Sequence, residues 1–161
     1  MSSEHIAIVQ SLSGTGALRI GGEFIKRFWP NKMIYLPTPT WPNHFGVFNA
    51  CELKIKQYRY YDPKTVGLDI DGLLEDLKAA EEGSVVLLHA CAHNPTGVDP
   101  SREDWVRIAK IIKDKGLLPF FDAAYLGFAS GDYDFDAFSI RYFLEQGITL
   151  LLALSFAKNM V

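Results

Sequence analysis

Apolar runs alternate with stretches of helical periodicity along nearly the whole chain. Short apolar runs bounded by turn residues predict buried strands. Such runs occupy residues 6–9, 33–36, 84–88, 117–121 and 148–154. A further segment, residues 53–60, alternates apolar and charged positions, which predicts a strand with one face in solvent.

Helices are predicted between these strands, where apolar residues recur three and four positions apart. Asp and Pro favour the first positions of a helix, and Gly favours the position just after its end. These signals predict helices from Gly16 to Phe28, from a cap at Asp71 to Gly83, from a cap at Asp99 to Gly116, and from about Asp136 to Gly147.

The order of these elements indicates the fold class. Strands in continuous apolar runs, each separated from the next by a helix, are typical of an α/β fold with three layers, αβα, around a mostly parallel sheet. The 161 residues suit one domain. We therefore expect residues 1–161 to form a single unit with right-handed crossovers.

Composition narrows the range of partners. Hydrophobic residues make up 48% of the chain and charged residues 22%, which is typical of a globular protein and excludes a disordered one. The net charge of −3 argues against nucleic acid, which selects basic surfaces. No run of 18 apolar residues is present, so we expect no membrane partner. Two cysteines and an N-terminus without a signal-peptide pattern favour an intracellular location.

Small and polar residues gather directly after the predicted strands. In an open parallel sheet, ligands bind beyond the carboxyl ends of the strands, which lie along one edge. The segments that follow the strands here are 11–16, 39–44, 89–97, 122–125 and 155–159. We expect all five to converge on one site.

Taken singly, most of these segments also allow a structural interpretation. Ser13, Gly14 and Thr15 precede a helix, and they either hold a phosphate or simply cap the helix. They do not begin a dinucleotide fingerprint, because Arg19 stands where a third glycine is required. Trp41 is either a plate that stacks on a ligand or a core side chain.

The charged and imidazole side chains of these segments also allow two interpretations. His89 and His93 are four residues apart, but they lack the Glu of a His-Glu-x-x-His motif, so we favour structural histidines and expect no metal. Asp122 and Lys158 each follow an apolar strand, where an unpaired charge is costly. They either pair with each other or contact one charged ligand, and a desolvated lysine can attack a carbonyl carbon.

Five motifs from these segments carry a resemblance when they are taken together. They are SLSGTGALR at 11–19, PTWPNH at 39–44, LHACAHNPTG at 88–97, FFDAAY at 120–125 and SFAKN at 155–159. In this order, and over nearly the whole chain, they resemble the class I aspartate aminotransferases, which are pyridoxal-phosphate enzymes of fold type I. The resemblance implies that residues 1–161 are part of the large, cofactor-binding domain of that fold.

The resemblance also implies a role for each matched residue. Lys158 would bond covalently to pyridoxal phosphate and move the proton between substrate and cofactor, and Asp122 would pair with the nitrogen of the pyridinium ring. Tyr125 and Asn94 would hydrogen-bond the ring oxygen, and Trp41 would stack on the ring face.

Further residues would support the cofactor and its phosphate. The phosphate would be bound by Ser13, Gly14, Thr15 and Ser155. His44 and His89 would support Asp122 and the ring from behind. The implied reaction transfers an amino group between L-aspartate and 2-oxoglutarate, so amino acids and 2-oxo acids would be the substrates. Members of the family are homodimers, and they work in the cytoplasm or in mitochondria.

The chain departs from the family pattern in several ways. Leu126 and Leu154 replace two glutamines that are usual in the family's motifs, and Val161 stands where a glycine is expected. The family's chains are longer at both ends, and those ends carry arginines that bind the phosphate and the substrate carboxylate. We therefore expect weak activity or none from residues 1–161 alone. A truncated, non-catalytic remnant that acts only through protein contacts stays open as an alternative, as does a nucleotide-binding α/β domain of another kind.

Overall fold

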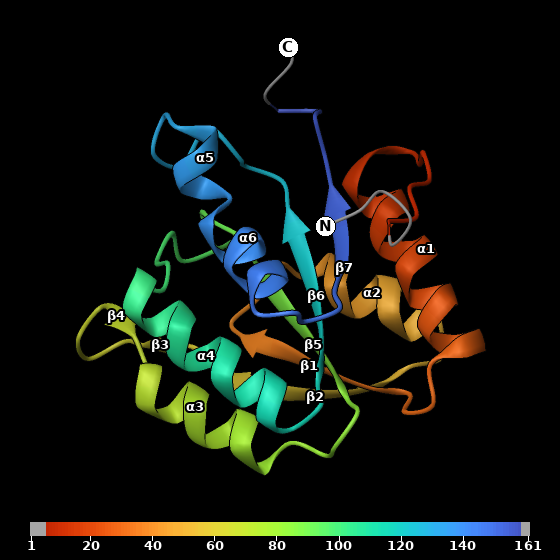
Figure 1. The fold of residues 1–161 in the computed structure, drawn as a ribbon, viewed down its shortest axis with the longest axis horizontal. Coiled ribbons are helices and arrows are strands. Elements are labelled where there is room, and N and C mark those ends of the chain that lie inside the picture. The colour runs from red at the N-terminus through yellow and green to blue at the C-terminus, as the bar shows by residue number, and fades with distance from the viewer. Residues whose placement is uncertain (1–5, 159–161) are drawn as a thin grey trace.

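A five-stranded parallel sheet forms the centre of the molecule (Figure 1). The computed structural model describes residues 6–158. The strands lie in the order β2-β1-β5-β6-β7. Their bounds are Met33–Thr38 for β1, Lys54–Arg59 for β2, Val85–His89 for β5, Leu118–Ala123 for β6 and Leu151–Leu154 for β7. A short antiparallel pair, β3 (Tyr61–Asp62) and β4 (Gly67–Leu68), lies outside this sheet.

Helices cover both faces of the sheet, so the predicted αβα arrangement is confirmed (Figure 1). One face carries α1 (Ser13–Phe28) and α2 (Asn43–Ala50). The other face carries α3 (Ile70–Ala79), α4 (Arg102–Asp114), the single turn α5 (Tyr133–Asp136) and α6 (Phe138–Glu145).

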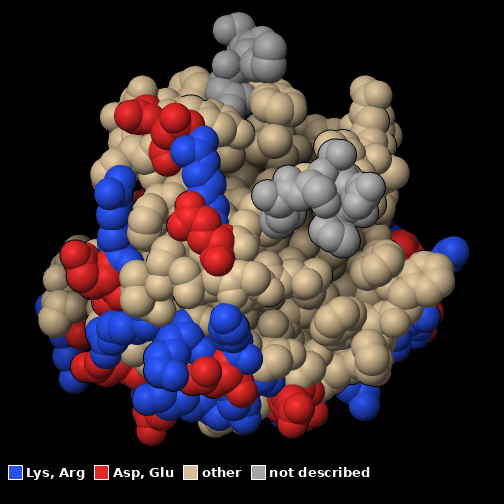
Figure 2. All heavy atoms as spheres, in the orientation of Figure 1, with Lys and Arg blue, Asp and Glu red and all other residues tan. Residues whose placement is uncertain are grey.

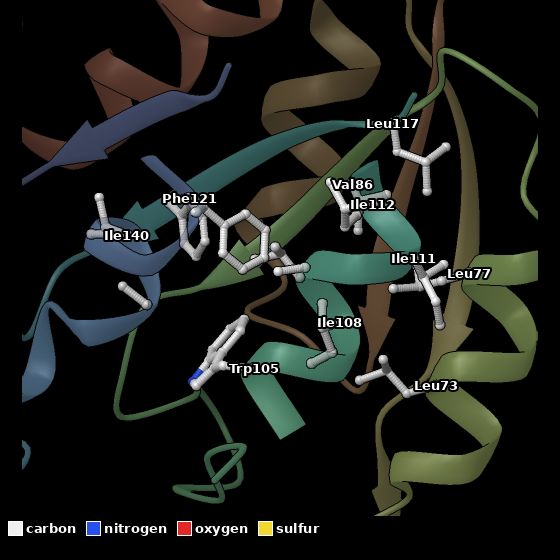
Figure 3. Close-up of a cluster of buried hydrophobic side chains, with 14 of the residues drawn as sticks. Leu73, Leu77, Val86, Trp105, Ile108, Ile111, Ile112, Leu117, Phe121 and Ile140 are labelled. Atoms are coloured by element: carbon white, nitrogen blue, oxygen red, sulfur yellow. The ribbon is translucent and has the colours of Figure 1, made fainter. Parts of the chain in front are cut away.

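Each face of the sheet has its own apolar core. In the larger cluster, Trp105, Phe121 and Phe143 contact one another with ring centroids 5.1 to 6.1 Å apart. Figure 3 shows how side chains of α3, α4 and the sheet meet in this cluster. In the smaller cluster, under α1 and α2, Phe48 contacts Phe120 at 6.0 Å. The two cores fix the sheet from both sides, and they leave the carboxyl ends of the strands free to carry a site.

The prediction of a strand at residues 6–9 is wrong. This segment has no regular secondary structure, and Ile8 and Val9 are 87% and 75% exposed. An apolar run becomes a strand only where a partner strand pairs with its backbone N–H and C=O groups. Among residues 6–158, no strand pairs with this segment.

The helix α2 is absent from the sequence prediction. Pro39, Pro42 and Asn43 are typical turn residues, and the helix is only eight residues long. Its buried side chains are just two, His44 and Phe48, four positions apart. A pattern of two residues is too short to show helical periodicity.

The cap of α3 lies two residues before the predicted one. The carboxylate of Asp69 accepts the Gly72 N–H at 2.9 Å, and Asp71 lies in the first turn instead. The helix ends at Ala79, so Gly83 belongs to the turn that follows and does not close the helix.

The cap of α4 lies two residues after the predicted one. Ser101 and Asp104 form a reciprocal capping box at the start of this helix. Asp99 does not cap it, because its two carboxylate oxygens accept the N–H groups of Ala92 and His93 at 2.6 and 2.9 Å. Gly116 follows the end of α4 with a φ of +59°, as predicted.

The C-terminal elements are shorter than predicted. The expected helix near Asp136 divides at Ala137 into α5 and α6. Gly147 has a φ of +72° just after α6, and the next N–H, that of Ile148, bonds back to the Phe143 carbonyl at 3.0 Å. Residue 148 is therefore still part of the turn that ends α6, and β7 begins only at residue 151. Within residues 6–158, no helix is both long and apolar enough to cross a membrane.

Candidate active site

The register of the sheet brings the predicted site segments together. His89, the last residue of β5, lies opposite Asp122 of β6, and Asp122 lies opposite Ala153 of β7. The polar segments 89–97, 122–125 and 155–158 therefore leave the sheet at the same edge. The segment 39–44, which follows β1, joins them there through hydrogen bonds to the same strand ends.

A carboxylate and an imidazole form the centre of this site. The Asp122 Oδ2 atom lies 3.0 Å from His44 Nε2. The His44 side chain is fully buried and the Asp122 side chain is 11% exposed, so the carboxylate faces the surface only at its outer end. A negative charge with so little water is costly unless it is paired, and His44 is the partner that the described residues supply.

Hydrogen bonds fix the orientation of His44 from the other side. Thr40 Oγ1 lies 2.8 Å from His44 Nδ1 and 3.3 Å from His89 Nε2. His89 Nδ1 in turn accepts the backbone N–H of Asn94 at 3.4 Å. Since that nitrogen accepts, the ring proton of His89 sits on Nε2 and is donated to Thr40.

The direction of the next two hydrogen bonds follows from this. Because Thr40 accepts a hydrogen bond from His89, its own hydroxyl group donates to His44 Nδ1. The Nε2–H group of His44 then donates to Asp122. Burial, with the neighbouring His93 and His44 as smaller causes, lowers the pKa of His89 well below its usual range. His89 is therefore a neutral donor at physiological pH, which the chain of bonds requires.

The start of α1 is suited to an anion. The N–H groups of Gly14 and Thr15 have no acceptor among residues 6–158, and the first turn holds no acidic side chain. Ser13 Oγ lies 2.9 Å from Ser155 Oγ, so hydroxyl groups from α1 and from the end of β7 meet there. A Cβ atom at Gly14 would lie only 3.3 Å from the Ser155 Cβ, so glycine at this position allows α1 to approach Ser155 closely. Free N–H groups at a helix start favour a phosphate.

Aromatic rings and an amine complete the arrangement. The Trp41 ring meets the His44 ring edge-on at 5.3 Å, so its position is tied to the group that holds Asp122. The Lys158 Nζ atom lies 3.9 Å from the centroid of the Tyr125 ring. The ammonium group rests on the face of the phenol, and no ion pair with Asp122 forms. The geometry therefore disfavours a simple salt bridge between Asp122 and Lys158.

The chain matches one known protein family over almost its whole length. The family described as aminotransferase class I and II matches residues 2–161. The chain belongs to this family. Asp122, the start of α1 and Lys158 are thus parts of a class I and II aminotransferase chain.

Individual relatives give the same result. Aspartate aminotransferase 1 of Medicago sativa is 59% identical over 160 residues, which are 99% of this chain and 38% of that protein. The cytoplasmic aspartate aminotransferase of Oryza sativa subsp. japonica is 56% identical, over 99% of this chain and 39% of that protein. The crystal structure of aspartate aminotransferase from Trypanosoma cruzi superposes with a TM-score of 0.97 at 50% identity, over 99% of this chain and 41% of that chain. This aminotransferase chain therefore spans less than half the length of these relatives.

The sequence-predicted site residues of this aminotransferase chain form three separate contact groups. One group is Trp41, His44, His89, Asn94 and Asp122, the second is Ser13, Gly14 and Ser155, and the third is Tyr125 and Lys158. Thr15 lies in the first turn of α1 with an exposed side chain, and no side-chain contact ties it to the others. Asn159 and Val161 lie outside the described residues.

Thr40 is the residue that the sequence reasoning missed. It bonds both histidines and is 7% exposed, yet its side chain has no chemistry that sets it apart from other threonines. Its place in the sequence, between Pro39 and Trp41, was the only sign of a role in the site. A polar residue in a buried motif has to hydrogen-bond something, and that rule alone would have selected it.

Proposed function

We propose that this chain forms the cofactor-binding part of a pyridoxal-phosphate-dependent aspartate aminotransferase, in which an amino group passes between L-aspartate and 2-oxoglutarate. The observation that carries the proposal is the directed chain of hydrogen bonds that ends on Asp122. It holds a largely buried carboxylate toward the site, where a pyridinium nitrogen would balance its charge. The names of the relatives support the reaction and its substrates.

The described residues fit pyridoxal phosphate at each of its ends. The free N–H groups of Gly14 and Thr15, with the hydroxyl groups of Ser13 and Ser155, suit the phosphate dianion. At the opposite end, Asp122 has one oxygen bound to His44 and the other available to a cationic ring nitrogen. Both groups lie at the carboxyl ends of β6 and β7, which are neighbours in the sheet.

Each residue then has a defined task. When it is bound, pyridoxal phosphate supplies the electron sink for the carbanion that forms at the substrate Cα. Asp122 holds a proton at the ring nitrogen, because a fixed carboxylate stabilises the cationic ring. Lys158 binds the cofactor through its amine and moves the proton at the substrate Cα.

The remaining site residues orient the ring. Tyr125 and Asn94 donate hydrogen bonds to the ring oxygen, and Trp41 covers one ring face and keeps water from it. His44 and His89 keep Asp122 in place. Because orientation supplies much of the rate of such reactions, these residues support catalysis without exchanging protons themselves.

The setting of the whole protein is part of the same proposal. Residues 1–161 would be part of the large cofactor-binding domain, and the complete enzyme would be an intracellular homodimer that acts on amino acids and 2-oxo acids. Relatives are named as cytoplasmic, mitochondrial and chloroplastic forms, so the family works in more than one compartment. Apolar side chains are exposed along α1, at Ile20, Phe24 and Phe28. Such a patch supports the proposal that another protein chain covers this surface in the complete enzyme.

Borohydride trapping tests the proposal directly. The purified chain is mixed with pyridoxal phosphate and reduced, and the modified peptides are identified by mass spectrometry. We expect the adduct on Lys158 ahead of the exposed Lys110 and Lys113, and we expect Lys158→Ala to lose it. Lys110→Ala, whose amine pairs with Asp114 on the outer face of α4, is the matched control and should keep the adduct. Even labelling of all lysines, unchanged in Lys158→Ala, would refute the proposal and favour the non-catalytic remnant.

A further inference from the structure

A second cleft opens on the molecule outside the candidate active site. It lies between the start of α4 and the segment 129–139, which contains α5 and the first turn of α6, and its volume is about 200 Å³. None of the residues that the sequence analysis assigned to the site lines it. Sites for drug-sized molecules usually measure about 300–1,000 Å³, so this cleft suits a smaller molecule.

One lining residue of this cleft is a guanidinium group without an anionic partner. Among the arginines of residues 6–158, Arg102 alone makes no ion pair. Its guanidinium lies over the rings of Phe135 and Phe138, 4.9 and 4.8 Å from their centroids, and it makes no hydrogen bond to another described residue. The rings hold the group in place, while its N–H donors, which form a planar fork that suits a carboxylate, stay free.

A largely buried carboxylate lines the same cleft. The side chain belongs to Asp136, which is 5% exposed. Its Oδ2 atom accepts the N–H groups of Gly127, Ala129 and Ser130 at 2.8, 3.1 and 3.4 Å. Its Oδ1 atom has no hydrogen bond or ion pair within residues 6–158. A carboxylate with so little water is stabilised by a cationic donor.

The rest of the lining offers mainly apolar surface. Ala90, Trp105 and Phe138 contribute to it. The other polar side chains that line the cleft already have partners in the fold, and they are Asp99, Ser101, Ser130 and Ser139. Arg102 and Asp136 are therefore the two polar side chains that the fold leaves available to a ligand.

We propose that this cleft is a second binding site, which takes a free α-amino acid with an apolar side chain. The carboxylate of the ligand binds the Arg102 guanidinium, its ammonium group binds Asp136 Oδ1, and its side chain lies against Trp105 and Phe138. A zwitterion supplies both charges that the cleft lacks. A simple anion would meet the Asp136 carboxylate without compensation, and a simple cation would meet Arg102. The inference does not depend on the proposed function, because it concerns residues outside that site.

The three tryptophans report on different places in the molecule. Trp105 lines the cleft, and Figure 3 shows its indole nitrogen turned away from the other labelled apolar side chains. Trp41 lies beside His44 in the candidate active site, and the Trp29 indole N–H is bound to the Gly83 carbonyl at 2.7 Å. The indole N–H signals in proton and nitrogen-15 NMR of the chain without cofactor therefore distinguish binding in the cleft from binding elsewhere.

Three probes separate the two charged contacts. They are L-leucine, 4-methylpentanoate, which is leucine without its amine, and 3-methylbutylamine, which is leucine without its carboxylate. Each is titrated into the natural chain, so that both contacts are tested without a substitution. Arg102→Gln then removes the cation at an exposed position, where the fold tolerates it. Arg107→Gln, on the same helix and also exposed, is the matched control, because its guanidinium pairs with Asp71 and Asp104 instead.

We expect L-leucine to shift the Trp105 signal saturably and to leave the Trp41 and Trp29 signals in place. Each analogue should bind about 10-fold more weakly or less tightly still, because each loses a hydrogen bond between charged groups. Arg102→Gln should weaken the binding of L-leucine by a similar factor, and Arg107→Gln should leave it unchanged.

Several results would overturn the inference. They are a Trp105 signal that L-leucine does not move, equal binding of 4-methylpentanoate and L-leucine, and equal binding of L-leucine by Arg102→Gln and the natural chain. A shift of the Trp41 signal in place of the Trp105 signal would put the ligand in the candidate active site, and it would overturn the inference as well. Failure of borohydride trapping on Lys158 would refute the proposed function alone, because none of these signals requires the cofactor.

Discussion

At the scale of single residues, the hydroxyl group of Thr40 connects both halves of the site. It accepts a hydrogen bond from the His89 imidazole and donates one to the His44 imidazole, so two buried histidines depend on one oxygen. Valine has nearly the same shape as threonine but lacks this oxygen. A change at this single atom therefore isolates the hydrogen bonds from the packing.

Thr40→Val should destabilise the fold and loosen Asp122. Two buried ring nitrogens, on His44 and His89, would lose their partner, and each such loss costs about 1–3 kcal/mol. Since there are two such losses, we expect the free energy of unfolding in urea to fall by roughly 2–6 kcal/mol. Thr38→Val, at an exposed position of β1, is the matched control and should change stability little. Equal effects of the two substitutions would contradict the argument.

The buried histidines also predict how stability depends on pH. The pKa of His93 is lowered to about 4 in the folded chain, against about 6.5 when unfolded. Above pH 6.5 the ring is neutral in both states. As the pH falls from 6.5 toward 4, only the unfolded chain gains the proton, so stability is lost across this window and the loss is complete below about 4.

The size of this pH effect follows from the shift. Each pKa unit corresponds to about 1.4 kcal/mol, so His93 contributes a loss of at most roughly 3.5 kcal/mol. Chemical unfolding at pH 7 and at pH 4.5 measures it, and His93→Gln is the control, since glutamine does not titrate. The natural chain should lose more stability than this variant over the same interval. A variant that is as sensitive to acid as the natural chain would assign the effect to other groups.

The sequence predicts the convergence of the site residues well, and their connections poorly. Asp122, His44 and His89 come together because parallel strands end at one edge, and that rule needs no coordinates. The direction of the bonds between them depends on which atom already has a partner. Thr40 and the backbone N–H of Asn94 decide that, and neither is distinguished by residue type.

At the scale of elements, α1 lies unusually close to the sheet. A Cβ atom at Gly22 would lie 2.5 Å from the Cys51 Sγ, and one at Gly21 would lie 2.3 Å from the Phe120 ring. Alanine stabilises most helices relative to glycine, by about 1 kcal/mol. Here the two glycines allow α1 to pack closely against Phe120 of β6 and against Cys51 at the end of α2.

Gly22→Ala should therefore destabilise the chain, although it adds a better helix former. Overpacking a tight contact costs about 1–3 kcal/mol, which exceeds the gain in helix propensity. Gly46→Ala in α2 is the matched control, because its added Cβ would meet no atom within 4 Å, and it should stabilise the chain by about 0.5–1 kcal/mol. Thermal unfolding of both variants measures the difference. If both substitutions stabilise the chain, the close packing of α1 would be disproved.

The elements themselves divide into those that local signals determine and those that they do not. The apolar run alone correctly predicts buried strands such as β5 and β6, because each is covered on both faces. The run at residues 6–9 has the same composition, yet it lacks a partner strand and stays irregular. The caps at Asp69 and Ser101 lie two residues from the predicted ones. Asp71 lies inside the first turn of α3, and the Asp99 carboxylate binds the N–H groups of Ala92 and His93 instead of capping α4.

At the scale of the whole molecule, charge is distributed unevenly over the face that Figure 2 shows, where charged side chains gather over α3 and α4 and far fewer lie around α1. The two edges of the sheet differ in the same way. The edge strand β2 carries Lys54, Lys56 and Arg59, which discourage pairing with another strand, whereas residues 147–157 around β7 hold no charged side chain.

The edge formed by β7 should make the purified chain associate with itself. In the described part of the molecule, β7 pairs only with β6, and Leu152 on this strand is 42% exposed. An uncharged edge with exposed apolar side chains recruits further strands. We expect oligomers whose mass rises with concentration in size-exclusion chromatography with light scattering. Leu152→Lys should return the chain toward the monomer, because a charge at the edge opposes pairing. Val106→Lys, at an equally exposed apolar position on α4, is the matched control and should leave the oligomers in place. A monomeric natural chain at every concentration, or equal rescue by both lysines, would show that this edge does not drive association.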